Sequence, residues 1–178
     1  QRIYKRSPDG QYTFLSGDAR QPGIISLGWN LAAADGQSAL KSDAGIWAQA
    51  MKAGPDGSLY LRCPSLAGIL RIDPQGILHV VLGYGPYGYT PDGTSARSAY
   101  CVATTGFGSL AIAVDGTVYF DDGWYREGKP YNFIRKVAPD GRIYTLMGQA
   151  GPLIPTGTWM EDWRDLMGQS AQNTRLNP

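Results

Sequence analysis

Three segments of the chain repeat one pattern around a proline that is followed two residues later by a glycine. They align without a gap and are Arg2–Gly17, Gly68–Gly83 and Phe133–Gly148. In each, an isoleucine lies five residues before the proline, a basic residue three before it, and a glycine nine after it. The prolines Pro8, Pro74 and Pro139 are spaced 66 and 65 residues apart. Self-similarity of this kind indicates a fold built from repeated supersecondary units.

Each of these segments is predicted to be a β-hairpin. Proline fixes φ at about −65° and suits the second position of a turn, and the glycine accepts the positive φ that follows. Strand-forming residues flank the turn, such as Ile69 and Ile72 before Pro74. A second hairpin precedes two of the three segments, at residues 49–61 and 109–120. It turns at Asp-Gly, which is the strongest short-range hairpin signal.

Two successive hairpins form a four-stranded antiparallel unit, the blade of a β-propeller. The expected strands lie near residues 44–53, 58–62, 68–73 and 77–82 in one unit, and near 107–114, 117–121, 132–138 and 143–147 in the next. A lead-in segment precedes each unit, at Asp35–Ala39 and Asp92–Ala96, and a third copy starts at Gly168. Period-two alternation places four side chains between neighbouring units: Ile69, Leu78, Ile134 and Ile143.

The predicted fold class is therefore all-β, a partial β-propeller with two complete four-stranded blades and partial flanking blades. Residues 1–178 form part of one propeller in this interpretation. The end of a blade lies at 1–17, complete blades at 35–83 and 92–148, and the start of a further blade at 168–178. A closed propeller needs about four to eight blades. We therefore expect the rest of the parent polypeptide, or other protein chains, to complete the ring.

Two stretches resemble the NHL-repeat propeller family. Leu110–Tyr119 matches its first hairpin, and Asn132–Gly141 matches its second almost residue for residue. The earlier unit departs from the pattern, with Met51-Lys52-Ala53-Gly54 in a strand position and Gln75 at the turn. The blades look most like those of teneurins and bacterial RHS (YD-repeat) proteins. That resemblance implies a larger secreted or delivered protein, in which a propeller lies beside a β-shell that encloses cargo, and an extracellular or cell-surface location.

The composition of the chain limits the classes of partner that we expect it to bind. Only 17% of residues are charged and the net charge is +1, which gives no electrostatic reason to expect nucleic acid. No apolar window reaches the length of a membrane span.

Aromatic residues in three predicted loops, at 83–89, 121–132 and 157–165, are the candidate binding residues. Aromatic rings beside arginine are typical of protein-binding hot spots, and rings also stack on glycans. The alternative is that they anchor long loops to the chain's own surface, and a short helix near 157–167 would pack in the same way. The candidates are Tyr84, Tyr87, Tyr89, Trp124, Tyr125, Arg126, Trp159 and Trp163.

Catalysis has little support in the sequence. His79 is the only histidine and lies in the middle of a predicted strand, where a structural role is expected. Asp121-Asp122 suggests either a calcium ligand or a solvated loop, and zinc lacks Cys/His clustering. Cys63 and Cys101 either pair or are buried unpaired. We expect no catalytic residue, metal or cofactor here.

Two functional classes follow from these observations. The first is a non-catalytic scaffold or protein-interaction module. The alternative is part of a six-bladed propeller hydrolase or lyase whose metal site lies in blades outside this chain.

Overall fold

The computed structural model describes residues 2–16, 31–42, 48–83, 85–101, 108–126 and 129–148. Their regular structure consists of ten β-strands and short 3-10 helices at Leu31–Ala34, Ala39–Lys41, Pro64–Leu66 and Ala96–Ser98, with no α-helix in the described part. The all-β prediction is therefore confirmed.

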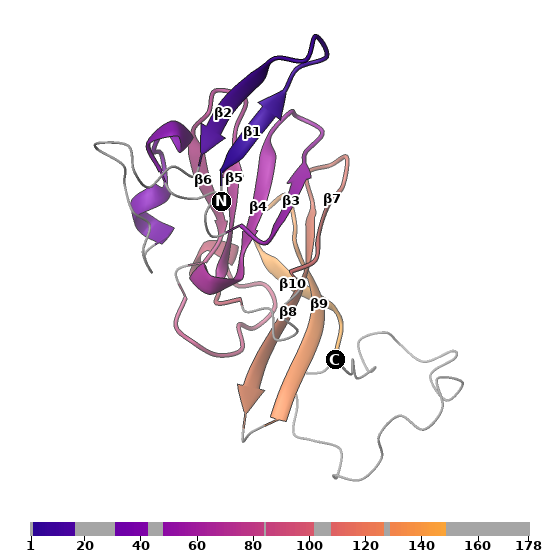
Figure 1. The fold of residues 1–178 in the computed structure, drawn as a ribbon. Helices are drawn as coiled ribbons and strands as arrows, with labels where there is room; N and C mark the ends of the chain where they lie inside the picture. The colour runs from indigo at the N-terminus through magenta and orange to yellow at the C-terminus, as the bar shows by residue number, and fades with distance from the viewer. Residues whose placement is uncertain are drawn as a thin grey trace.

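The strands form one hairpin and two four-stranded antiparallel sheets (Figure 1). The hairpin pairs β1 (Ile3–Arg6) with β2 (Tyr12–Ser16). The first sheet contains β3 (Ala50–Ala53), β4 (Leu59–Cys63), β5 (Gly68–Ile72) and β6 (Leu78–Leu82), in chain order. The second contains β7 (Leu110–Ile112), β8 (Val118–Arg126), β9 (Lys129–Val137) and β10 (Ile143–Met147), again in chain order.

The three proline hairpins share an irregularity in addition to their turns. In each, the pairing register shifts by one residue directly after the repeated isoleucine. The pairs on either side of the shift are Ile3↔Ser16 and Tyr4↔Phe14, Ile69↔Leu82 and Leu70↔Val80, and Ile134↔Met147 and Arg135↔Thr145. Such a bulge bends its strand and re-aims the neighbouring side chains. The sequence repeat is thus also a repeat of backbone geometry.

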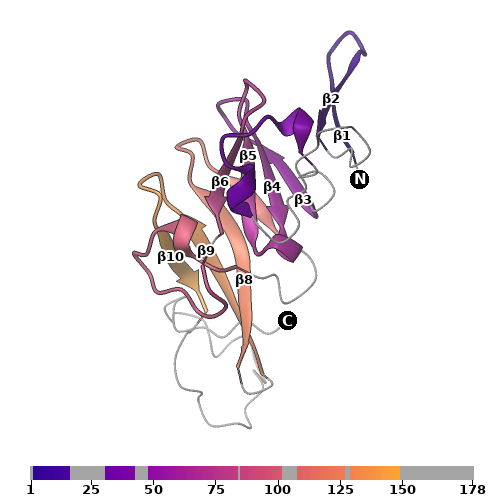
Figure 2. The same ribbon diagram turned by 90° about the vertical axis from the view of Figure 1, so that its left-hand side faces the viewer.

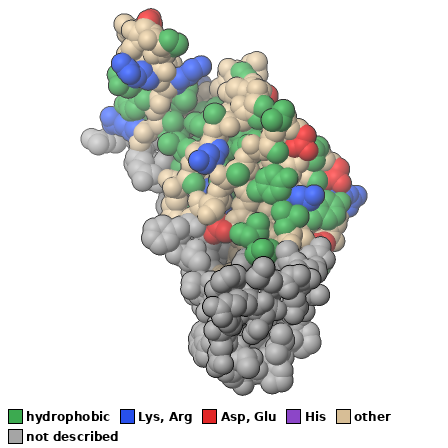
Figure 3. Space-filling view, turned by 90° about the vertical axis from the view of Figure 1, so that its right-hand side faces the viewer, with side chains coloured by type: hydrophobic (Ala, Val, Ile, Leu, Met, Phe, Trp, Pro, Cys, Tyr) green, Lys and Arg blue, Asp and Glu red, His purple; other side chains and the backbone are tan. Residues whose placement is uncertain are grey.

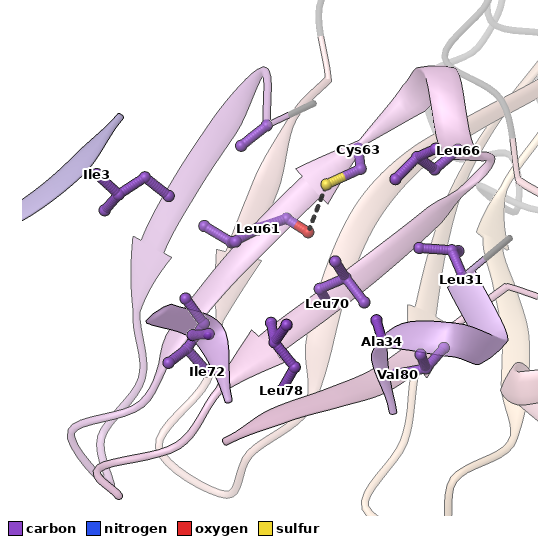
Figure 4. Packing of buried hydrophobic residues seen from close by; sticks show 12 residues of the cluster. Ile3, Leu31, Ala34, Leu61, Cys63, Leu66, Leu70, Ile72, Leu78 and Val80 are labelled. Atoms are coloured by element: carbon purple, nitrogen blue, oxygen red, sulfur yellow. Dashed lines mark hydrogen bonds between the residues drawn. The ribbon is translucent and has the colours of Figure 1, made fainter. Parts of the chain in front are cut away.

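The hairpin and the two sheets stack face to face as three layers with two apolar cores between them (Figure 2). The core between the hairpin and the first sheet (Figure 4) contains Ile3, Leu31, Ala34, Ala39, Ala48, Leu61, Cys63, Leu66, Leu70, Ile72, Leu78 and Val80. The core between the sheets contains Tyr60, Ile69, Leu82, Ala96, Ala99, Cys101, Leu110, Val118, Phe120, Val137 and Ile143. Strand β3 also contacts β7, so the first strands of the two sheets lie side by side.

The two lead-in segments run along the outer edges of β6 and β10 with the same hydrogen bonds. The first segment makes Gly36 N–H to Leu78 O at 2.8 Å, Leu78 N–H to Gln37 O at 2.8 Å and Ala39 N–H to Gly76 O at 2.8 Å. The second makes Gly93 N–H to Ile143 O at 2.9 Å, Ile143 N–H to Thr94 O at 3.0 Å and Ala96 N–H to Gly141 O at 2.9 Å. Each segment therefore pairs with the edge of its own sheet through one isolated β-bridge, Ser38↔Ile77 in the first and Ser95↔Arg142 in the second.

Three of the four predicted inter-unit side chains, Ile69, Leu78 and Ile143, are fully buried. The prediction is wrong for Ile134, which is half-buried. Its counterparts Ile3 and Ile69 each face the following layer and are covered by it. No described residue forms a further layer over the second sheet, so Ile134 has no corresponding cover from the described part of the chain.

The loop predicted at residues 121–132 is also wrong. Strands β8 and β9 continue through it as a regular ladder that reaches Arg126↔Lys129 and leaves only two residues between the strands. Aromatic residues favour extended backbone, and here they extend the hairpin despite Gly123. Of the strand predicted at 44–53, residues 44–47 lie outside the described part of the chain, and β3 begins at Ala50.

Candidate functional site

Two arginines, Arg62 on β4 and Arg135 on β9, are fully buried near the interface of the two sheets. Arg135, on β9, has no exposed surface. Its Nη1 donates to Asp122 Oδ2 at 3.2 Å, and its Nη2 donates to the Thr90 carbonyl and to Asp92 Oδ1, the latter at 3.2 Å. The guanidinium lies over the Tyr89 ring, 5.1 Å from its centroid. This combination of charge-assisted bonds and a cation–π contact is what a buried guanidinium requires.

Arg62, at the end of β4, connects the first sheet to the second. Its Nη1 donates to Gly68 O at 3.4 Å and its Nη2 to Asp121 O at 3.2 Å. The guanidinium carbon lies 5.9 Å from the centroid of the Phe120 ring. Within the described part of the chain, the Nε atoms of Arg62 and Arg135 have no hydrogen-bond partner. We call Arg62, Asp92, Asp122 and Arg135 the arginine cluster.

Burial controls the ionisation of the groups around this cluster. It raises the pKa of Asp122, an effect that the nearby Arg135 guanidinium opposes. It also raises the pKa of the Cys101 thiol well above its usual value and that of Cys63 to about 12. Both cysteines are free and buried, in different cores, so unpaired burial is confirmed. Because a thiolate is the reactive form of cysteine, neither thiol is suited to nucleophilic chemistry at neutral pH.

An aspartate at the head of each lead-in segment fixes that segment to its sheet. Asp92 Oδ1 accepts from Thr145 N–H at 2.9 Å and from Thr145 Oγ1 at 2.8 Å. Asp35 Oδ1 accepts in the same way from Val80 N–H at 2.9 Å, and its Oδ2 pairs with Arg97. The carboxylates thus satisfy backbone donors that a strand edge otherwise leaves open.

The predicted aromatic residues do not form one cluster. Tyr89 is half-buried and packs against Phe133 at 5.6 Å and beneath Arg135, which agrees with the anchoring alternative. Tyr87 stacks edge-on with Tyr100 at 5.3 Å and is 61% exposed. The backbones of Trp124, Tyr125 and Arg126 lie on β8, opposite β9, instead of in a loop. Tyr84, Trp159, Trp163 and the predicted helix lie outside the described residues.

His79 and Asp122 form hydrogen bonds with neighbouring side chains of the fold. His79, on β6, places Nε2 2.7 Å from Asp73 Oδ2, and Asp73 also accepts from Ile77 N–H within the turn. Asp122 is buried against Arg135, so the interpretation of this pair as a solvated loop is wrong. Among the residues described, no group of three or more His, Cys, Asp or Glu side chains is placed to hold a metal ion.

Sequence reasoning missed the arginine cluster, although the aligned repeat contained a signal for it. Arg135 occupies the position of Leu70 in the preceding hairpin, because both directly follow the repeated isoleucine. A charge at a core position of a repeat requires an oppositely charged partner, and Arg135 has two, the buried Asp122 and the exposed Asp92. The shared aspartate of the lead-in segments was a second signal.

No protein-family model matches this chain, and no curated protein matches it either. No helix in the described ranges is long and apolar enough to cross a membrane.

Proposed function

We propose that this chain is a run of consecutive NHL-type β-propeller blades that serves as a non-catalytic scaffold and protein-interaction module. The observation that carries the proposal is the identical docking of two lead-in segments on two stacked four-stranded sheets. The first strands β3 and β7 lie together, while the last strands β6 and β10 hold the lead-in segments. Blades arranged around an axis are expected to have this order.

The chemistry of the described residues favours binding over catalysis. The Nη atoms of the arginine cluster are bonded to carboxylates and backbone carbonyls, burial raises the pKa of both thiols, and His79 is paired with Asp73. The ring of Tyr87 is exposed, as a binding contact requires. Aromatic rings of this kind dominate protein-binding energetics. From the motifs at 110–119 and 132–141, we assign the parent to larger secreted or delivered proteins of the RHS or teneurin kind.

A photo-cross-linking experiment in cells that produce the full parent polypeptide tests the interaction function. A benzophenone amino acid replaces either Tyr87 or, as the control, Val114, which is 92% exposed in the turn after β7. We expect adducts with protein segments outside residues 1–178 from position 87 and not from position 114. Equal yields at the two positions, or none at position 87, would argue against this binding surface.

A further inference from the structure

One face of the N-terminal hairpin is rich in exposed aromatic and basic side chains. Tyr4 is 49% exposed, Tyr12 is 69% exposed, Arg6 is exposed and Phe14 is half-buried. Tyr4 and Phe14 stack edge-on at 5.5 Å, and the Arg6 guanidinium lies 5.9 Å from the Tyr12 ring centroid. Figure 3 shows hydrophobic and basic side chains side by side where this hairpin projects at the top of the molecule.

The same four positions are buried in both other hairpins. The residues of the three hairpins can be matched one to one, because in each hairpin the two cross-strand pairs concerned follow the same bulge. The buried counterparts are Leu70, Ile72, Leu78 and Val80 in the first sheet, and Arg135, Val137, Ile143 and Thr145 in the second. The face formed by Tyr4, Arg6, Tyr12 and Phe14, which we call the open face, is therefore the position at which the repeat normally receives a cover.

In the first sheet, part of the cover comes from the lead-in segment and the residues just before it. Leu31, Ala34 and Ala39 are buried in the same core as Leu70, Leu78 and Val80 (Figure 4). Small side chains allow the segment to lie close to the strand while its backbone pairs with the β6 edge. The second lead-in segment likewise buries Ala96 in the core that contains Ile143.

The edge of β2 presents the backbone groups that such a segment needs. Arg6↔Tyr12 corresponds in register to Ile72↔Leu78, and the Leu78 N–H and C=O both bond to the lead-in segment. The N–H and C=O of Tyr12 therefore point away from β1, as those of Leu78 point away from β5. Among the described residues, β2 pairs with β1 alone.

We propose that the β2 edge and the open face bind an Asp-Gly-polar-Ser-Ala segment of the parent polypeptide that lies N-terminal to Gln1 and adopts the conformation of the two lead-in segments. Its glycine N–H donates to Tyr12 O, its polar residue accepts from Tyr12 N–H, and its alanine N–H donates to Gly10 O. Its aspartate carboxylate accepts from Phe14 N–H, as Asp35 accepts from Val80 N–H. The partner is recognised by β-augmentation, with the carboxylate and alanine giving specificity.

The spacing of the repeat places this segment. Gly36 precedes its partner Leu78 by 42 residues, and Gly93 precedes Ile143 by 50. Counted back from Tyr12, the same spacing puts the segment roughly 30 to 40 residues before Gln1. This inference rests on the proposed function, in which the chain is a run of repeated blades. Its test measures hydrogen exchange at the edge of β2 alone.

Hydrogen-exchange mass spectrometry on the 178-residue chain tests the proposal with a synthetic peptide as the probe. The peptide has the sequence of residues 33–42, AADGQSALKS. At millimolar concentration we expect it to slow exchange several-fold in the fragment that contains Tyr12 and Phe14. A control peptide with Gly36→Pro and Ala39→Pro lacks both donors and should leave that fragment unchanged.

A pair of protein variants separates edge pairing from face contact. Tyr12→Pro removes the edge donor and should abolish protection, whereas Tyr12→Val retains the donor and should keep most of it. Unchanged exchange in β4 and β5 reports that the fold is intact in each variant, so failure at β2 is distinguishable from failure of the repeat architecture. Absence of protection with the first peptide, or protection that survives Tyr12→Pro, would overturn the proposal.

Discussion

At the end of the third hairpin, Gly148 has a φ of +99°, in the left-handed region that favours glycine. A Cβ there would lie 2.5 Å from the Asn132 carbonyl oxygen and 2.9 Å from a Phe133 ring carbon. Gly141, in the turn of the same hairpin, has a φ of +76°, but a Cβ there would meet nothing within 4 Å. The two glycines thus share a backbone conformation and differ in the space around them.

This contrast predicts different costs for the same substitution. Gly141→Ala should destabilise the protein by about 1 kcal/mol, the usual cost of a left-handed alanine. Gly148→Ala adds a clash with backbone and should cost about 3 kcal/mol or more. The midpoint of urea unfolding at one fixed protein concentration gives the comparison. Equal losses for the two variants would contradict the close approach of Gly148 to Asn132.

The lowered pKa of Asp35 predicts that the stability of the protein depends on pH. Burial raises its pKa, but the Val80 N–H and Arg97 outweigh that effect, and the net shift is downward. A carboxyl group with a lowered pKa in the folded state stabilises the protein fully above its unfolded pKa of about 3.9, and this contribution is lost as the pH falls from that value through the lower folded pKa. Asp35→Asn should therefore destabilise the protein at pH 6, and its difference from the parent chain should shrink steadily as the pH is lowered below about 4. Urea midpoints across this range measure it, and a constant difference would contradict the role of the charge.

At the scale of strands and sheets, the arginine cluster joins elements that are far apart in the sequence. Arg135→Met would leave Asp122 as a buried carboxylate without its guanidinium. Loss of one partner of a buried ion pair costs about 3–5 kcal/mol, so we expect a loss of that size. Lys136→Met, one residue along β9, is the control and should cost less than about 1 kcal/mol, because its charge is near the surface. Equal effects of the two variants on the unfolding midpoint would show that the cluster does not stabilise the sheets.

The sequence predicts the elements that depend on local turn chemistry, and it does not predict those that depend on contacts between distant strands. The turns at Pro8, Pro74, Pro139 and the two Asp-Gly pairs were predictable because their chemistry is local. The hairpin at 121–132 was not, since the β8–β9 ladder of nine residue pairs, Val118↔Val137 to Arg126↔Lys129, outweighs the turn signals of Gly123 and Pro130. The pairing of the buried Arg135 with Asp122 and Asp92 was missed because it depends on how separate strands and the second lead-in segment come together. Aligning the repeats position by position would have pointed to it.

At the scale of the whole molecule, each layer buries its apolar face only against the next one. In such architectures stability is a sum over interfaces between neighbouring units. The described residues form two interfaces, one on each side of the first sheet. The open face of the hairpin and the half-buried Ile134 on the second sheet mark the outer surfaces of this stack. We expect further units or other chains to cover both surfaces.

Sedimentation equilibrium of the 178-residue chain, combined with thermal unfolding at low and high concentration, tests this dependence on neighbours most directly. If the outer layers need cover, the chain should associate, and both its average mass and its melting temperature should rise with concentration. A monomer that melts in one cooperative transition at a temperature independent of concentration would contradict the account and would indicate a fold that closes on itself.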